Sequence, residues 1–241
     1  MKKLGLIGGV GPESTIPYYR GIVYGVQKKV GRSYFPPLTI ESLSAFEVIR
    51  MSSQGLREEL TAYLLAGIRN LEASGADFGA LACNTGHMVF EELQAQSHIP
   101  LVSIVDVTCA EAQRQGFQKL GLLGTTATMD SAFFKRPFER AGMEIVTPLN
   151  AEKAWVAQKI TEELEFGIVK PETASGFQKI VEGMAEQKGI EAVVLGCTEL
   201  PMLFENTALS VPILDTMQLH IAALVETIME DGGMNYETQG P

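Results

Sequence analysis

Two segments of this chain are close copies of each other, DFGALACNT at residues 77–85 and EAVVLGCTE at residues 191–199. Each is a short apolar run that ends in a cysteine and then turns polar. Such a run is typical of a buried strand in a parallel sheet, followed by a turn at the carboxyl end of the strand. The two cysteines, Cys83 and Cys197, are 197 − 83 = 114 residues apart. This spacing indicates that the second half of the chain repeats the fold of the first.

Two further pairs of segments repeat in the same order. LGLIGG at 4–9 returns as LGLLGT at 120–125, an offset of 120 − 4 = 116, and IPLV at 99–102 returns as VPIL at 211–214, an offset of 211 − 99 = 112. Three matches at nearly one offset indicate an internal duplication into two lobes, not a solenoid. Because apolar runs alternate with segments of helical period, we predict an α/β protein with two pseudo-symmetric lobes, each with a mostly parallel sheet flanked by helices.

The same patterns predict individual elements. In the first half we expect strands at residues 4–8, 38–42, 78–82 and 101–104, with helices from about 14 to 29 and from about 56 to 74. The end of the chain, residues 232–241, is rich in glycine and polar residues, and we expect it to be disordered.

The composition limits the classes of function. The chain has 241 residues, 46% hydrophobic and 20% charged, so it can bury a core without disulfides or a structural metal. A net charge of −10 argues against a nucleic-acid partner, and no apolar stretch is long enough to cross a membrane. The three cysteines lack the paired spacing of zinc or redox motifs, which is typical of a reducing cytoplasm. We therefore expect a cytoplasmic protein whose ligand is a small molecule.

The repeated cysteines are the first candidates for chemistry. Ligands of open parallel sheets bind beyond the carboxyl ends of the strands. If the two lobes pack with those ends facing each other, Cys83 and Cys197 face one another across a cleft between the lobes. Each cysteine also begins a turn into an expected helix, whose backbone N–H groups and dipole would favour the thiolate. The alternative is that each is a small apolar residue at a strand end, which we prefer for a single cysteine but not for two at equivalent positions.

Opposed thiols predict a specific reaction. A thiolate can accept a proton and a thiol can donate one, so a pair on opposite faces of a carbon can invert it without a cofactor. The site must also bind a carboxylate, and hydroxyl and amide side chains at the same strand ends could form a neutral cradle for it. Those side chains are Asn84, Thr85, Thr125, Thr126 and Thr198. Taken singly, each of them is also a common turn or cap residue.

These motifs resemble those of the aspartate/glutamate racemase family. The resemblance rests on ACNTGH at 82–87, GCTELP at 196–201 and the opening motif GGVGPEST at 8–15, and it extends from about residue 4 to about residue 225. It implies an active site in the inter-lobe cleft, Cys83 and Cys197 as acid and base, no pyridoxal phosphate, no metal and a homodimer. It also implies a first lobe over residues 1–104, completed by a helix within 216–231, and a second lobe over 105–215.

The resemblance also points to two charged residues. Aspartate-type members of the family use an arginine and a lysine to bind the side-chain carboxylate, and Arg50 and Lys170 occupy the corresponding regions here. Ordinary surface positions are the alternative for both. Some members replace one cysteine with threonine and become nearly one-directional, whereas this chain keeps both, so the resemblance implies reversible racemisation.

Four further residues close to these motifs in the sequence are candidates for supporting roles at the site. Gly9 and Glu13 lie beside the expected cleft, and His87 follows Cys83 by one helical turn and could tune it or serve in packing. Glu199 could act in the same way on Cys197 or cap its own helix. A dinucleotide-binding loop after the first strand is disfavoured, because its third glycine position holds Ser14 and the nearest strand-end acid lies 41 − 9 = 32 residues after Gly9, against about 20 in that motif.

Three functions therefore remain in order of preference. The first is racemisation of aspartate, glutamate or both, between which the sequence does not choose. The second is a maleate-type cis–trans isomerisation on the same scaffold, with a cysteine as nucleophile. The third is a non-catalytic protein that binds acidic amino acids or dicarboxylates.

Overall fold

The computed structural model describes residues 1–31, 34–204 and 207–230, so the expected tail at 232–241 lies outside the described residues. The chain divides into two compact units. Among the described residues, unit 1 contains Met1–Ala82, Val89–Ser103 and residues 220–230, and unit 2 contains Cys83–Met88 and Ile104–Leu219. The short segment Cys83–Met88 therefore belongs to the same unit as Cys197, although the strand before it belongs to the other.

Unit 1 is built on a parallel sheet of four strands in the order β2-β1-β3-β4. Its strands are β1 (Leu4–Gly8), β2 (Leu38–Ser42), β3 (Phe78–Leu81) and β4 (Leu101–Val102). The first two have the predicted bounds, while β3 ends one residue early and β4 two residues early, because Ile104 already begins a helix. The helices of this unit are α1 (Pro12–Val30), α2 (Ala45–Ser53), α3 (Arg57–Ala73) and α4 (Phe90–Gln96).

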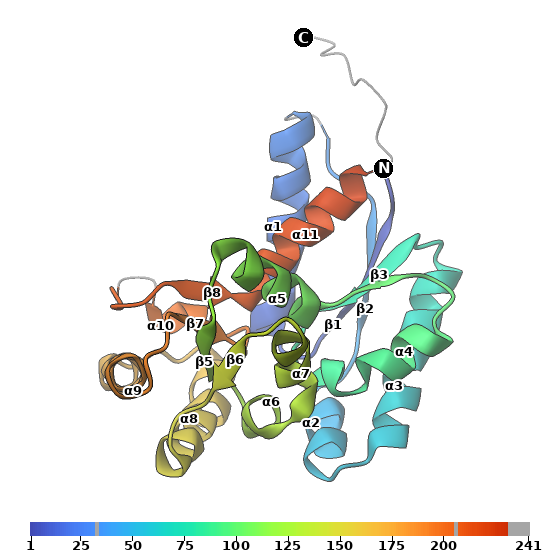
Figure 1. Cartoon of the computed structure of the whole chain (residues 1–241). Helices are drawn as coiled ribbons and strands as arrows, with labels where there is room; N and C mark the ends of the chain where they lie inside the picture. Colours follow the sequence, from blue (N-terminus) through green and yellow to red (C-terminus); the bar gives the residue numbers. More distant parts are fainter. Residues whose placement is uncertain (32–33, 205–206, 231–241) are drawn as a thin grey trace. The chain divides into compact units, whose positions relative to one another are not determined.

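The end of the last helix, α11 (Thr216–Met229), packs against α1 within unit 1 (Figure 1). The two helices approach closely because α1 presents glycine at the contact. A Cβ at Gly21 would lie 2.9 Å from Ile221, and one at Gly25 would lie 2.7 Å from Val225. Beneath this contact the buried hydroxyl of Tyr18 lies 2.8 Å from Nδ1 of His220. The described part of the chain after residue 219 is thus part of the first folding unit.

Unit 2 repeats the sheet of unit 1 strand for strand. Its four parallel strands have the order β6-β5-β7-β8, and they are β5 (Lys119–Leu123), β6 (Glu144–Val146), β7 (Ala192–Leu195) and β8 (Ile213–Asp215). The pairing Leu120↔Ala192 corresponds to Leu4↔Phe78 in the first sheet. The predicted class, α/β with a parallel sheet in each half, is confirmed, and the internal duplication is visible in the strand order.

Helices and an apolar core surround the second sheet. The helical elements are α5 (Ile104–Gln115), α6 (Thr126–Asp130), α7 (Ala132–Arg140), α8 (Asn150–Glu162), α9 (Pro171–Lys188), α10 (Pro201–Phe204) and the 3₁₀ turns η1 (Thr85–Val89) and η2 (Leu164–Phe166). The core between them contains Leu122, Phe134, Phe177 and Val194, all fully buried. Within residues 1–31, 34–204 and 207–230, no helix has the length and apolar character needed to cross a membrane.

Candidate active site

The two repeated cysteines occupy equivalent places in the structure and lie in one folding unit. Cys83 comes two residues after the end of β3, and Cys197 comes two residues after the end of β7. Both side chains are buried, with 5% and 9% of the residue exposed. Since Cys83–Met88 belongs to unit 2, the surroundings of both thiols can be described from that unit alone.

Cys197 is paired with the carboxylate of Glu199. The thiol donates to Oε2 of Glu199 across 2.8 Å, and the hydroxyl of Thr198 donates to the same oxygen across 3.1 Å. Burial, the negative charge of Glu199 and this hydrogen bond raise the pKa of Cys197 well above its ordinary value. The half-buried carboxylate of Glu165, in η2, raises it further. The resting form of Cys197 is therefore the thiol.

Cys83 is influenced by the same carboxylate. Burial raises the pKa of the Cys83 thiol to about 11, and the charge of Glu199 acts in the same direction. A hydrogen bond from the backbone of Gly86 lowers this pKa and offsets part of the rise. Glu199 therefore acts electrostatically on both thiols, and both cysteines belong to unit 2.

The backbone N–H groups after the cysteines act as expected, because hydrogen bonds from Gly86 and Glu199 lower the pKa of Cys83 and Cys197, but burial outweighs them and the net shift of each pKa is upward. The turn after Cys83 is the 3₁₀ helix η1, and the helix after Cys197 is α10, only four residues long. Such short helices have little macrodipole to offer. Desolvation, which the sequence does not reveal, is the largest cause of the pKa shift at both thiols.

His87 holds the turn that presents Cys83. The backbone N–H of Ile104 donates to Nε2 of His87 across 3.2 Å, so Nδ1 carries the proton and donates to the carbonyl of Cys83 at 2.9 Å. Burial lowers the pKa of His87 to about 4, and the ring is neutral at physiological pH. The imidazole thus links the cysteine turn to the first residue of α5.

Asn84 is joined to a residue that the sequence did not single out. Its Nδ2 donates to the hydroxyl of Thr216 at 3.3 Å, and that hydroxyl donates to the carbonyl of Leu195 at 2.8 Å. Asn84 Oδ1 is buried without a hydrogen-bond partner in the described part of the chain. Thr216 follows the third repeated segment, where its sequence neighbours give no sign of this contact. Glu165 was also missed, because it stands in an irregular stretch outside every repeat.

The remaining threonines of the expected cradle have different surroundings. Thr125 caps α6, because its Oγ1 accepts from the backbone N–H of Thr128 at 3.3 Å, so its hydroxyl has the common capping role. Thr126 is exposed and Thr85 is half-buried within η1. Thr198 is buried and hydrogen-bonded to Glu199, which places it directly at the Cys197 pair.

Gly9 and Glu13 lie in unit 1, after β1. Gly9 has a φ of 76°, and a Cβ there would lie 2.3 Å from the carbonyl of Leu43, so only glycine fits this turn. Its N–H donates to Thr15 Oγ1 at 2.9 Å. Glu13 is exposed in the first turn of α1. Their supporting roles at the cleft stay predictions.

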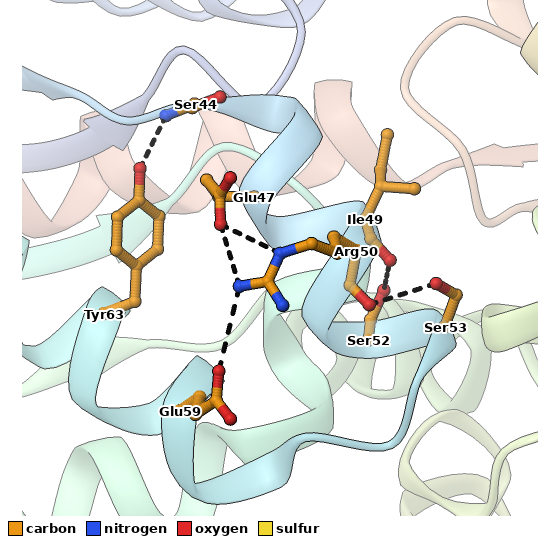
Figure 2. Close-up of polar contacts among 8 residues, drawn as sticks. All are labelled: Ser44, Glu47, Ile49, Arg50, Ser52, Ser53, Glu59 and Tyr63. Carbon is orange, nitrogen blue, oxygen red and sulfur yellow. Dashed lines mark hydrogen bonds and ion pairs between the residues drawn. The ribbon is translucent and has the colours of Figure 1, made fainter.

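Arg50 is held by two carboxylates on the surface of unit 1 (Figure 2). Its Nε and Nη2 lie 3.1 Å and 2.9 Å from Oε2 of Glu47, and Nη2 lies 3.7 Å from Oε2 of Glu59 on α3. The hydrogen bond and charge of Glu47 raise the pKa of Arg50 above its ordinary value. The guanidinium is therefore already engaged with the chemical group that it was predicted to bind in a substrate.

Lys170 is engaged in the same manner in unit 2. Its Nζ lies 3.1 Å from Oε1 of Glu163, a buried carboxylate that also contacts Lys159 and Thr173. These contacts, that of Lys159 first, lower the pKa of Glu163 to about 2. The expected contact of Lys170 with a substrate stays a prediction. In the part of the chain that the structure describes, no three His, Cys, Asp or Glu side chains are grouped to hold a metal ion.

Comparisons with known proteins agree with one another. The model of the Asp/Glu/hydantoin racemase family matches residues 7–224. The chain is 26% identical over 232 residues to the broad specificity amino-acid racemase RacX of Bacillus subtilis, covering 94% of this chain and 98% of RacX. It is 25% identical over 188 residues to a glutamate racemase of Aquifex aeolicus, covering 75% and 70% of the two chains. The crystal structure of an aspartate racemase homologue from Pyrococcus horikoshii superposes with a TM-score of 0.82 at 35% identity, covering 95% of this chain and all of that one.

Proposed function

This chain belongs to the Asp/Glu/hydantoin racemase family, and we propose that it inverts the α-carbon of aspartate or glutamate with Cys83 and Cys197 as the two proton-transferring groups. Membership of the predicted family is confirmed, and so is the predicted enzyme class, an amino-acid racemase. The acidic substrate, the two thiols and independence from pyridoxal phosphate belong to the proposal.

One observation carries the assignment of the thiols: Cys83 and Cys197 are both buried two residues after equivalent strands within unit 2, where the charge of Glu199 raises the pKa of each. Inversion of a carbon needs one group that removes its proton and another that delivers a proton to the opposite face. Two buried cysteines at equivalent strand ends, influenced by one carboxylate, supply two such groups of the same kind. Because both groups are thiols, either one can act as the base, and the reaction can run in either direction.

The raised pKa values define how the base is generated. Both thiols are protonated at rest, so a proton must leave one of them before chemistry begins. Glu199 accepts the proton of Cys197 along their existing 2.8 Å hydrogen bond when the substrate's ammonium group adds a positive charge to the site. A nearby positive charge favours the thiolate over the thiol.

Proton transfer then follows a balanced course. The thiolate of one cysteine takes the α-proton and becomes a thiol, while the thiol of the other cysteine gives its proton to the opposite face and becomes a thiolate. The substrate leaves with its configuration inverted, and the pair is left ready for the opposite enantiomer. Water and Glu199 return the proton to its starting place between turnovers.

Two features support an acidic substrate. Lys170 belongs to unit 2, as both thiols do, and we assign its ammonium group to the side-chain carboxylate of the substrate, whereas the role of Arg50 stays a prediction. Relatives named for glutamate and aspartate fit this choice. The match to RacX, named for broad specificity, favours a second candidate in which the same reaction extends to neutral amino acids.

A chiral assay tests the proposal. Purified protein under reducing conditions is incubated with L-aspartate, L-glutamate, L-alanine and L-serine, and the D-isomers are measured. We expect D-isomer from an acidic substrate, and its loss in Cys83→Ser and Cys197→Ser. Cys109→Ala is the matched control, because Cys109 is a buried cysteine of unit 2 in α5, outside the repeated motif. No D-isomer from any substrate, or full activity in either site variant, contradicts the proposal.

A further inference from the structure

The carboxamide of Asn84 has one satisfied end and one unsatisfied end. The residue is 4% exposed, and its Nδ2 donates to Thr216 Oγ1 at 3.3 Å. Its Oδ1 is buried and has no hydrogen-bond partner among residues 1–31, 34–204 and 207–230. A buried acceptor without a donor is costly, and native proteins rarely keep one without a reason. Because none of the described residues supplies the missing donor, we look for it in a bound ligand.

The orientation of this carboxamide follows from the hydroxyl of Thr216. A threonine hydroxyl has a single proton, and that of Thr216 is directed at the carbonyl oxygen of Leu195, 2.8 Å away. Its oxygen can therefore only accept from Asn84, and only the amide nitrogen can donate to it. A flipped carboxamide would set two acceptors against each other. Asn84 Oδ1 is thus fixed as the free acceptor.

The hydroxyl of Thr216 is hydrogen-bonded to both repeated cysteine segments, 77–85 and 191–199. It is fully buried at the start of α11, directly after β8. One of its hydrogen bonds goes to Asn84, the neighbour of Cys83, and the other to Leu195, two residues before Cys197. All of these residues belong to unit 2. A single hydroxyl therefore couples the backbone before one thiol to the side chain beside the other.

We propose that Thr216 is a positioning residue that holds Asn84 with its Oδ1 open to accept a hydrogen bond from the α-ammonium group of the substrate. The inference rests on the proposed function, since an amino acid supplies such a donor. A carboxylate has no proton to donate and cannot satisfy this oxygen. The arrangement therefore selects amino acids over dicarboxylates of the same size, and it sets which end of the substrate lies beside Cys83.

The test compares a ligand that has the amino group with one that lacks it. Binding of L-aspartate and of succinate is measured by calorimetry for the wild-type protein, Thr216→Val and Thr216→Ser, together with kcat and KM for racemisation. Thr216→Val keeps the shape of the side chain and removes the hydroxyl. We expect it to weaken aspartate binding about tenfold or more, as loss of a hydrogen bond to a charged group does, and to change succinate binding less than about twofold. Thr216→Ser restores the wild-type preference.

A matched control separates positioning from stability. Thr108 in α5 is also fully buried, and its hydroxyl also donates to a backbone carbonyl, that of Ile104 at 2.7 Å. Thr108→Val should cost similar thermal stability and leave the aspartate-to-succinate preference unchanged. If Thr216→Val does not fold, Asn84→Ala must show the same selective loss of aspartate binding. In an Asn84→Ala background, Thr216→Val should have no further effect on that preference.

The outcomes are distinguishable. Equal weakening of aspartate and succinate by Thr216→Val, or the same loss of preference in Thr108→Val, overturns the positioning role and leaves the racemase proposal standing. A wild-type protein that converts no amino acid overturns the racemase proposal, and the calorimetric preference then decides the role of Thr216 by itself. A selective loss of aspartate binding in Thr216→Val that Thr216→Ser reverses supports it.

Discussion

The thiol of Cys197 donates a 2.8 Å hydrogen bond to the carboxylate of Glu199. This contact stabilises the protonated thiol and at the same time provides the acceptor for its proton. The negative charge of Glu199 also raises the pKa of Cys83. One carboxylate therefore sets the resting protonation of both cysteines, and the first prediction concerns its charge.

Glu199→Gln should lower the pKa of both thiols, because it removes a negative charge that disfavours each thiolate. The pH dependence of alkylation by iodoacetamide, read for each cysteine by mass spectrometry, should shift to lower pH. Racemisation should nevertheless slow by about tenfold or more, since the proton acceptor of Cys197 is lost. Glu162→Gln, at an exposed position of α8, is the control and should change neither property. Unchanged alkylation profiles in Glu199→Gln would show that its charge does not act on the thiols.

The raised pKa of Cys83 predicts a specific loss of stability in alkali. The folded protein keeps this thiol protonated up to about pH 11, whereas the unfolded chain releases the proton near 9.0. The contribution is fully present below 9.0 and is lost as pH rises toward 11, at a slope of up to about 1.4 kcal/mol per pH unit. Urea unfolding between pH 8 and pH 10.5 should fall more steeply for wild type than for Cys83→Ala. Parallel curves would contradict the assigned pKa.

Arg50→Met should reduce the preference for an acidic substrate. If the predicted contact with the side-chain carboxylate is made, its removal should lower kcat/KM for aspartate by about tenfold or more. Arg57→Met is the matched control, because Arg57 is likewise an exposed arginine paired with a glutamate, Glu92 at 2.6 Å. Equal effects of the two variants would assign Arg50 to the surface network with Glu47 and Glu59 alone.

Much of the fold was predictable because its signals are local. The apolar runs at Leu4–Gly8 and Leu38–Ser42 are bounded by glycine or polar residues, and their strands have the predicted limits. The repeated segments correctly indicated two similar lobes, and the structure adds that their sheets have the same strand order. A short strand such as Leu101–Val102 was overestimated, because an apolar run does not show where the helix after it begins.

The surroundings of the site were less predictable because they depend on tertiary contacts. The motifs identified Cys83, Asn84 and Cys197, but the contact of Asn84 with Thr216 joins residues 132 positions apart. The net upward shift of the thiol pKa values was not predicted, because a sequence shows the N–H groups that follow a cysteine and not its burial. The capping role of Thr125 was recognisable as one of two alternatives, and the structure shows that its hydroxyl caps α6.

The most direct test of two proton-transferring thiols is solvent labelling during the first turnovers. The reaction is run in deuterated water from the L-enantiomer of the best acidic substrate and stopped after a few per cent of conversion. The two enantiomers are then separated, and the deuterium content of each is measured by mass spectrometry. A two-thiol mechanism predicts deuterium at the α-carbon of the D-product and protium in the remaining L-substrate, because each thiol serves one face and exchanges its proton with solvent between turnovers. Equal labelling of both enantiomers at the earliest times, or a product that retains the original proton, would show a single shared base and contradict the two-thiol mechanism.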